Sequence, residues 1–457
     1  MMALPCCTSR GAPLLEIAPF RALHYDPAKV SFISRLVAPP YDLIDPDDAD
    51  ELRRRDPHNV IRLILGKEGP TGRRPEEYGQ AAATFAEWQR EGVLTAAQEP
   101  GVYVCEQAFT LDGTPHVRHG LICTILLEEF SSGQVLPHER TMEGPRADRL
   151  RLMEACGASL SQVFGVYSDP QGRADAATRE MAQGAPFYEF ADPDGVAYRV
   201  WRVTDARRIQ AVASLLRVEV LFIADGHHRY EAALQYRALH RPANAPPGCA
   251  PEDFLPVFCV SVKNAGLRIL PTHRLVRSQG AFDPGAFLHA VSARFTVVER
   301  RVTGPEELER AFRESIEPTD DIGCYLGRER FYVLSLKSQD MMDRALADRP
   351  PAWRRLPVTR LHYAILDPLL SIPAEGPAPA GSVEFTQHIA AVYWGVEAGR
   401  FGAGFLLPPI PAAIVETVAR ARHRMPSKST FFYPKIATGL AFYQFALNRG
   451  LAAARRS

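Results

Sequence analysis

With 457 residues, of which 46% are hydrophobic and 23% charged, the chain has the size and composition of a globular protein with more than one domain. Its 53 basic and 53 acidic side chains give a formal net charge of +0, so no overall basic field attracts nucleic acid or an anionic membrane. The sequence has no apolar run of the ~20 residues that a membrane span needs, no signal-peptide pattern and no CxxC pair among its eight cysteines, so we expect a cytoplasmic protein without a nucleic-acid or membrane partner.

Up to residue 157 the pattern predicts short strands, helices and one hairpin. Apolar pieces in 20–27 and 57–65 are expected to be strand-like. Helices are predicted over 45–55, 75–92 and 144–157, because each combines helical spacing of apolar residues or acids in its first turn with a bounding glycine, proline or aspartate. The triplet Leu111-Asp112-Gly113 predicts a hairpin turn, followed by the buried strand "LICTILL".

The second half of the chain shows the same mixture of elements. A helix over 205–217, the buried strand "VEVLFIA" and a further helix "YEAALQYRALHR" follow one another. Two strands are predicted within 253–276, and a helix–strand–helix–strand pattern begins at about residue 280. The stretch "SIPAEGPAPAGS" is too rich in proline, alanine and glycine to be anything but a loop or linker, and "PAAIVETVARAR" predicts a helix after it.

These elements predict an α/β fold with mixed α+β content. The expected domain organisation is a disordered tail, a catalytic phosphate-binding core, an α+β unit, a linker and a C-terminal section whose "KST" loop closes the active site. The corresponding ranges are 1–13, 14–280, 281–370, 371–382 and 383–457.

The run "DGHHR" lies between the buried strand "VEVLFIA" and its following helix, where backbone N–H groups and the positive end of the helix dipole suit an anion. Gly226 allows close approach or a positive φ, and Arg229 offers a planar fork for phosphate oxygens. His227 and His228 add donors, and Asp225 is placed to accept a hydroxyl proton or to hold hydrated Mg²⁺. The run therefore predicts a phosphate-binding turn with an acid–base residue.

Two other interpretations of the same run stay open. Asp225 would cap the helix in the first, and the histidines would satisfy buried backbone groups. In the second, His227 and His228 would ligate a metal ion, although adjacent residues seldom do so without distant partners.

Three further motifs carry candidate residues. "LPHERTMEGPRADR" gathers charge after an apolar strand, as an active-site rim or a solvated loop would. "RMPSKSTFFYPK" offers an ammonium and two hydroxyls for a phosphate or a carboxylate, with Lys435 as a lesser candidate, unless it is simply an exposed loop. In "APPYDLI" a carboxylate either grips a substrate ammonium or caps the next helix, and "PHNVIRLIL" places two polar side chains on a predicted strand. The candidates are His138, Glu139 and Arg140; Lys428, Ser429 and Thr430; Tyr41 and Asp42; and Asn59 and Arg62.

The "DGHHR" turn is similar to the phosphate-binding signature of the ParB/sulfiredoxin superfamily. Eight segments in order, from "FRALHYDP" through "LPHERTMEGPRADRLRLM" and "IADGHHRYEAAL" to "MPSKSTFFYPK", resemble a bacterial and archaeal family described as a domain of unknown function. Its members look like relatives of free-serine kinases. The resemblance implies a ParB/sulfiredoxin-like core with additional α+β units, and phosphorylation of L-serine with Mg²⁺ and ATP, ADP or pyrophosphate as donor.

Under this hypothesis either Asp225 or Glu139 is the general base, and Arg140 and Arg229 neutralise the transferred phosphoryl group. The sequence contains no GxxxxGK[ST] loop, protein-kinase signature or GxGxxG, so nucleotide binding would depend on "DGHHR". Two alternative functions are a nucleotide-responsive switch of the ParB-like class and a metal-dependent phosphohydrolase. The sequence leaves the donor, the exact acceptor and the oligomeric state open.

Overall fold

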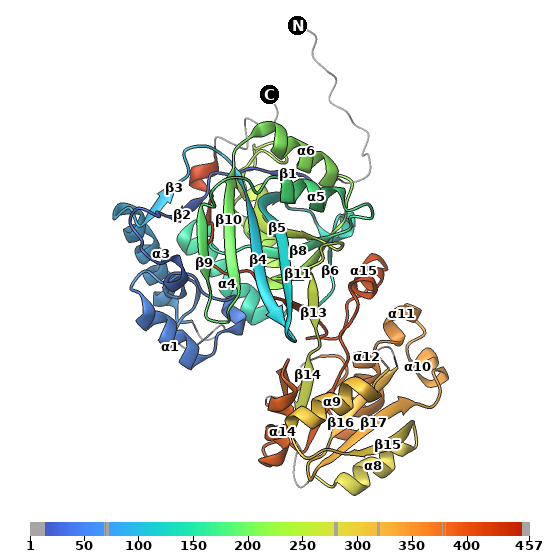
Figure 1. The fold of residues 1–457 in the computed structure, drawn as a ribbon. Helices are drawn as coiled ribbons and strands as arrows, with labels where there is room; N and C mark the ends of the chain where they lie inside the picture. Colours follow the sequence, from blue (N-terminus) through green and yellow to red (C-terminus); the bar gives the residue numbers. More distant parts are fainter. Residues whose placement is uncertain are drawn as a thin grey trace. The chain divides into compact units, whose positions relative to one another are not determined.

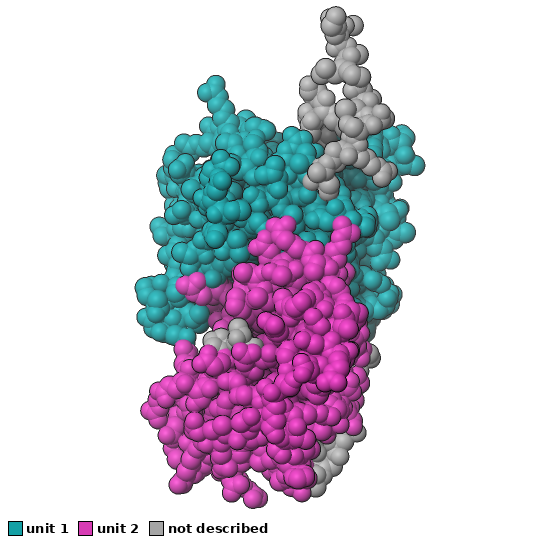
Figure 2. Space-filling view, turned by 90° about the vertical axis from the view of Figure 1, so that its right-hand side faces the viewer, with its two compact units in different colours: residues 1–137, 141–267, 434–457 teal, residues 138–140, 268–433 magenta. Residues whose placement is uncertain are grey.

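The computed structural model describes residues 14–67, 69, 73–277, 282–317, 320–376, 378–379 and 381–449. The predicted tail, residues 1–13, lies outside these ranges. The chain divides into two compact units (Figure 2): unit 1 comprises Met1–Pro137, Thr141–Leu267 and Pro434–Ser457, and unit 2 comprises His138–Arg140 and Arg268–Tyr433. The predicted division into five ranges stays a prediction.

Unit 1 is built on a nine-stranded mixed sheet in the order β6-β11-β8-β12-β5-β4-β10-β9, with β1 paired to β5 (Figure 1). Strand β11 pairs in parallel with β6 and antiparallel with β8, and β12 pairs in parallel with β8. The strands are β1 (Ile17–Ala18), β4 (Val102–Leu111), β5 (Thr114–Leu126), β6 (Val135–Pro137), β8 (Val163–Tyr167), β9 (Tyr188–Ala191), β10 (Ala197–Val203), β11 (Leu221–Asp225) and β12 (Phe254–Ser261).

Helices and two small ribbons complete unit 1. The ribbons pair β2 (Leu23–Tyr25) with β3 (Leu94–Ala96), and β7 (Ala158–Ser159) with β21 (Tyr443–Gln444). The α-helices are α1 (Pro46–Arg55), α2 (Ile61–Ile64), α3 (Pro75–Arg90), α4 (Glu143–Cys156), α5 (Arg173–Glu180), α6 (Ala206–Leu216) and α7 (His227–His240). Short 3₁₀ turns are η1 (Ile33–Arg35), η2 (Tyr41–Leu43), η3 (Phe130–Ser132), η4 (Pro251–Asp253) and η6 (Ala446–Asn448).

Unit 2 contains a six-stranded antiparallel sheet in the order β15-β17-β16-β19-β14-β18. Its strands are β14 (His273–Val276), β15 (Phe295–Arg301), β16 (Asp321–Tyr325), β17 (Arg330–Leu336), β18 (Val383–Thr386) and β19 (Ala403–Leu406); β13 (Arg268–Leu270) and β20 (Phe431–Tyr433) form a separate ribbon. The helices are α8 (Pro284–Ser292), α9 (Pro305–Ser315), α10 (Asp340–Ala345), α11 (Pro351–Arg354), α12 (Pro357–Leu361), the π-helix η5 (His362–Leu366), α13 (Asp367–Leu370), α14 (Ile389–Glu397) and α15 (Ala412–Arg420).

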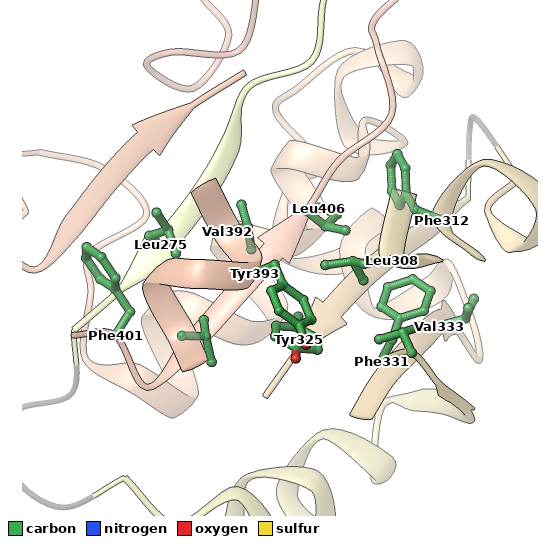
Figure 3. Close-up of a cluster of buried hydrophobic side chains, with 12 residues drawn as sticks. Leu275, Leu308, Phe312, Tyr325, Phe331, Val333, Val392, Tyr393, Phe401 and Leu406 are labelled. Atoms are coloured by element: carbon green, nitrogen blue, oxygen red, sulfur yellow. The ribbon is translucent and has the colours of Figure 1, made fainter. Parts of the chain in front are cut away.

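The core of unit 2 joins its sheet to helices α9 and α14. Figure 3 shows Leu308 and Phe312 of α9, Val392 of α14, and Leu275 and Phe331 of the sheet in one cluster of buried side chains. The apolar positions of "PEELERAFRES" recur at helical spacing, which is why α9 lays one face on the sheet and leaves its charged face in solvent. This packing fixes strand β14, which carries the buried Arg274.

The predicted α/β class with mixed α+β content is confirmed. So is the hairpin, in which Asp112 and Gly113 take positive φ values of 50° and 73°, the conformation of a type I′ turn. Two predictions were wrong. Residues 57–65 contain the short helix α2 rather than a strand, and 253–276 contains three strands rather than two. A short apolar run does not distinguish a strand from a buried helix, and Ile61 and Leu63 are both fully buried.

Within the described ranges no helix is long and apolar enough to cross a membrane.

Candidate active-site residues

The strand-to-helix turn predicted from "DGHHR" is present in unit 1. Asp225 ends β11, Gly226 has φ +89°, and α7 begins at His227. The N-cap residue Gly226 has no side chain with which to cap this helix, and the first turn contains no acidic residue. The N-terminal N–H groups and the helix dipole therefore present a positive end here that no carboxylate of the same turn neutralises.

The carboxylate of Asp225 lies in a buried ion pair with two cations. Its Oδ1 accepts a hydrogen bond from Lys435 Nζ and its Oδ2 one from Arg229 Nη2, each at 2.5 Å. The other terminal nitrogen of Arg229 donates to the backbone oxygen of Gln162. The interpretation of Asp225 as a helix cap is thus wrong, and the guanidinium of Arg229 is directed at protein groups.

The two cations decide the charge state of Asp225. Burial by itself would raise the pKa of this carboxyl, but Lys435 and then Arg229 outweigh burial and hold the pKa well below its ordinary value. Asp225 is therefore ionised at neutral pH and is a poor general base, because a useful base has a pKa near the working pH. Asp225, Lys435 and Arg229 form the Asp225 group, in which one carboxylate and two cations give a charge of +1.

The lowered pKa of Asp225 predicts a specific acid sensitivity. Because the folded-state pKa lies below the unfolded value of about 3.9, the ion pair stabilises the fold fully above that pH and loses its effect as the pH falls below it. We expect the free energy of unfolding to drop more steeply between pH 4 and pH 2.5 in the wild type than in Asp225→Asn, measured by urea titration. Parallel curves for the two proteins would contradict the ion pair.

Gly226 is required by the packing of Arg229. A Cβ built on Gly226 would lie 2.8 Å from Arg229 Nε, and the φ of +89° is one that other residues rarely adopt. This geometry explains the glycine without a ligand. Of the two interpretations that the sequence offered, the positive φ is confirmed, and close approach of a ligand stays a prediction.

Gly226→Ala is expected to destabilise the protein by more than the ~1–2 kcal/mol that left-handed backbone alone costs. The matched control is Gly113→Ala, since Gly113 has φ +73° but nothing within 4 Å of the added Cβ. Urea denaturation of both variants separates backbone strain from collision with Arg229. Equal losses for the two variants would show that Arg229 does not need the space.

Lys435 is held in place by two polar residues that sequence reasoning missed. Gln107 and Arg118 face each other in the β4–β5 ladder. The Gln107 amide donates to the backbone oxygen of Lys435 at 3.0 Å, and Arg118 donates to that of Pro434. Arg118 is fully buried, with its guanidinium over the Phe164 ring. The available signal was a glutamine and an arginine placed opposite each other in two strands of a hairpin.

The histidines of the turn have protein partners as well. His227 is buried, and His228 Nε2 accepts the backbone N–H of Met142 at 2.9 Å, which places any ring proton of the neutral form on Nδ1. The hydroxyl of Thr141 donates to Glu231 of α7. These contacts join the end of the "HERT" motif to the first turns of α7 within unit 1.

Magnesium does not fit on Asp225, because both carboxylate oxygens already bind cations. No group of three histidine, cysteine, aspartate or glutamate residues in the described ranges is placed to hold a metal ion. The metal site proposed from the two histidines, and with it the metal-dependent phosphohydrolase, has no support in this geometry.

Tyr41 and Asp42 are placed differently. Tyr41 is buried beneath the guanidinium of Arg149, 3.9 Å from its ring centroid. Burial raises the pKa of Tyr41 to about 12, and the charges of Arg229 and Asp225 also act on it, so Tyr41 lies near the Asp225 group. Asp42 is exposed, and the cap of the next helix is Asp45, which accepts the N–H of Asp48 at 2.8 Å. Of the two interpretations of Asp42, helix capping is therefore wrong, and binding of a substrate ammonium stays a prediction.

Asn59 and Arg62 have structural explanations. The amide of Asn59 is fully buried, donating to the backbone oxygens of Arg35 and Val37 and accepting from Ile61 N. Arg62 is exposed on α2 and donates to the backbone oxygen of Arg53. Their role in substrate binding stays a prediction.

A second group of candidates meets in unit 2. His138 is fully buried, and its Nε2 lies 2.7 Å from the Thr430 hydroxyl and 3.8 Å from Glu139 Oε1. Arg424 donates to the backbone oxygen of Glu139 at 2.6 Å, and Met425 N donates to that of His138 at 2.7 Å. The "HER" and "KST" segments, nearly 300 residues apart, are thus joined, with the Glu139 carboxylate partly exposed.

The remaining candidates of unit 2 are Lys428, Ser429 and Arg140, and they lie in different surroundings. Lys428 is exposed and has φ +56°, while the Ser429 hydroxyl is buried and donates to Pro426 O. Arg140 is exposed and pairs with Glu375 at 3.3 Å. Ser429 is therefore a structural link of the loop, whereas the side chain of Lys428 is exposed to solvent.

Comparisons with known proteins identify the family. Residues 17–359 match the family model described as "Protein of unknown function (DUF1015)". The chain belongs to the DUF1015 family. No curated protein matches this DUF1015 chain in sequence.

Among solved structures, a free serine kinase in complex with AMP is similar at 12% identity and a TM-score of 0.32, covering 70% of this chain and 92% of the other. A conserved hypothetical protein from Pyrococcus furiosus gives 12% and 0.33, with 71% and 97% covered. SbnI with C-terminal truncation from Staphylococcus aureus gives 11% and 0.32, with 71% and 90% covered. Likenesses of this size carry no argument about activity.

Proposed function

We propose that this DUF1015 protein is a small-molecule kinase that transfers a phosphoryl group from a nucleotide or pyrophosphate to the hydroxyl of free L-serine. The observation that carries the proposal is the start of α7. The N-terminus of α7, whose first turn contains no acidic residue, adjoins Lys435, Arg229 and Asp225, two cations and one carboxylate with a summed charge of +1. A helix dipole and an excess cation favour a bound phosphate over a bound neutral group.

In this proposal the Asp225 group binds and orients rather than abstracts a proton. Asp225 holds Lys435 and Arg229 in place, which pre-organises positive charge for the donor phosphates. Lys435, a lesser candidate in the sequence, becomes the favoured phosphate ligand of unit 1. His227 and His228 remain proposed ligands of the donor.

Glu139 is the better candidate for the general base. Its carboxylate is partly exposed, whereas that of Asp225 is buried between two cations. Taking up the serine hydroxyl proton frees the oxygen to form the new bond to phosphorus, while the bond from phosphorus to the donor's bridging oxygen breaks. Lys428 and Thr430 are proposed to bind anionic groups beside Glu139.

The resemblance of the ordered motifs to relatives of free-serine kinases supports serine as the acceptor, and that of "DGHHR" supports a ParB/sulfiredoxin-like phosphate-binding turn. Magnesium enters this scheme only with the donor phosphates, which bind it as a complex.

The decisive experiment incubates the full chain with L-serine, Mg²⁺ and, in separate samples, ATP, ADP or pyrophosphate. The expected result is a new phosphomonoester signal in ³¹P NMR with at least one donor, and none when L-alanine replaces L-serine. Release of inorganic phosphate without that signal would indicate a hydrolase, and nucleotide binding without turnover would indicate a switch. Either outcome overturns the kinase.

A further inference from the structure

Arg274 is a buried cation of unit 2 that the proposed chemistry has not used. It lies on β14, on the strand face opposite to Leu275, which packs in the core of Figure 3. The residue is fully buried. Its guanidinium donates to three backbone oxygens, those of Thr272, Ser427 and Lys428.

These contacts leave the charge of Arg274 without a counter-ion. Among the described residues no carboxylate lies within ion-pair distance of its guanidinium, and its Nε has no hydrogen-bond partner. A buried, unpaired cation is costly, because the interior cannot replace its hydration. In keeping with this, burial lowers the pKa of Arg274 to about 9. An anion arriving from solvent would remove the cost.

Two more polar side chains near Arg274 lack partners. Both ring nitrogens of His362 and the hydroxyl of Thr359 are shielded from solvent and form no hydrogen bond within the described part of the chain. These residues are three apart where α12 runs into η5, so they share a helix face. Tyr363, the residue after His362, donates to Glu375, which also pairs with Arg140, so η5 is joined to the segment that contains Glu139. The charge of Arg274 acts on His362 as well. A π-helical turn such as η5 often marks a functional site.

We propose that Arg274, His362 and Thr359 bind the carboxylate of the amino-acid acceptor. This inference rests on the proposed function, since it assigns the acceptor as a free amino acid rather than a simple alcohol. A carboxylate accepts hydrogen bonds from the guanidinium Nε, the imidazole and the hydroxyl, and supplies the missing negative charge.

The charges around Arg274 favour a monoanion over a phosphate. Burial lowers the pKa values of His362 and of neighbouring His273 to about 3, so both rings are neutral and Arg274 supplies a single positive charge. Glu139 lies close enough for its negative charge to act on Arg274. A dianionic phosphate would leave a surplus negative charge next to Glu139.

The test measures binding by calorimetry on the full chain, without turnover. L-serine, L-alanine, ethanolamine and inorganic phosphate are titrated separately. L-alanine keeps the carboxylate but cannot accept a phosphoryl group, and ethanolamine keeps the hydroxyl but has no carboxylate. We expect L-serine and L-alanine to bind at least tenfold more tightly than ethanolamine. Phosphate should not displace L-alanine.

Variants locate the site. Arg274→Gln and His362→Phe should weaken L-alanine binding by about tenfold or more, whereas Arg360→Lys should not. Arg360 is the matched control, a buried arginine of the same unit that is paired with Asp320 at 3.0 Å. Thermal unfolding checks that each variant is folded. If Arg274→Gln fails to fold, L-alanine binding by His362→Phe and the affinities of the wild type for the four ligands still test the assignment.

Wild-type-like L-alanine binding by folded Arg274→Gln or His362→Phe, equal affinity for ethanolamine and L-serine, or displacement of L-alanine by phosphate would each overturn the assignment. The outcome is separate from that of the kinase proposal. L-alanine binding that depends on Arg274, in a protein without phosphotransfer, would refute the kinase and leave this site standing.

Discussion

Asp225→Asn is expected to lower the free energy of unfolding by about 3–5 kcal/mol, the cost of removing one partner from a buried ion pair. The substitution leaves Lys435 and Arg229 buried against each other without the carboxylate that both contact at 2.5 Å. Helix capping by asparagine does not offset this loss, since the N-cap of α7 is Gly226 and Asp225 caps nothing. Urea denaturation followed by circular dichroism measures the loss.

Lys435→Met is the matched comparison for this loss. It removes one cation but keeps the pair between Asp225 and Arg229, so its effect on stability should be clearly smaller. Its effect on donor binding should be larger than its effect on stability, because the group then loses its net positive charge. Equal destabilisation by Asp225→Asn and Lys435→Met would show that the net charge of Asp225, Lys435 and Arg229 does not determine their contribution to stability.

Glu139→Gln is expected to lower kcat by about 10²–10⁴-fold, the usual contribution of a positioned general base. Glutamine keeps the shape of the side chain but cannot accept the serine proton. The fold should be unaffected, because the carboxylate is partly exposed and the backbone oxygen, not the side chain, binds Arg424. The measurement is the initial rate of O-phosphoserine formation with the donor found active, together with the donor KM.

Glu143→Gln controls for loss of charge in the same segment. The side chain of Glu143 is 83% exposed and, among the described residues, forms an ion pair with Arg146 alone, so its removal should change kcat by less than about twofold. A Glu139→Gln enzyme with wild-type kcat would exclude Glu139 as the base. A rise in KM at constant kcat would make it a substrate-binding residue instead.

The sequence by itself determined the local elements that carry the candidate residues. The β11–Gly226–α7 turn follows from an apolar β-branched run, a glycine and a helical repeat, all within about 25 residues. The hairpin at Asp112–Gly113 follows from backbone preferences of two residues. Such features are set by interactions between near neighbours, so periodicity and turn chemistry suffice to predict them. Where the local signal was ambiguous, as at 57–65, burial decided for a helix.

Only the tertiary structure decided which charges meet. Asp225 and Lys435 are 210 residues apart, and His138 and Thr430 are 292 apart. The sequence left open whether Arg274 lines the proposed pocket or simply ends a strand, and folding buries it with no carboxylate of the described residues within ion-pair distance. Burial and pairing depend on which distant segments the chain brings together, and they set each group's pKa and free hydrogen-bonding capacity. That is why the carboxylate of Asp225, one of the two candidates for the general base, instead binds two cations.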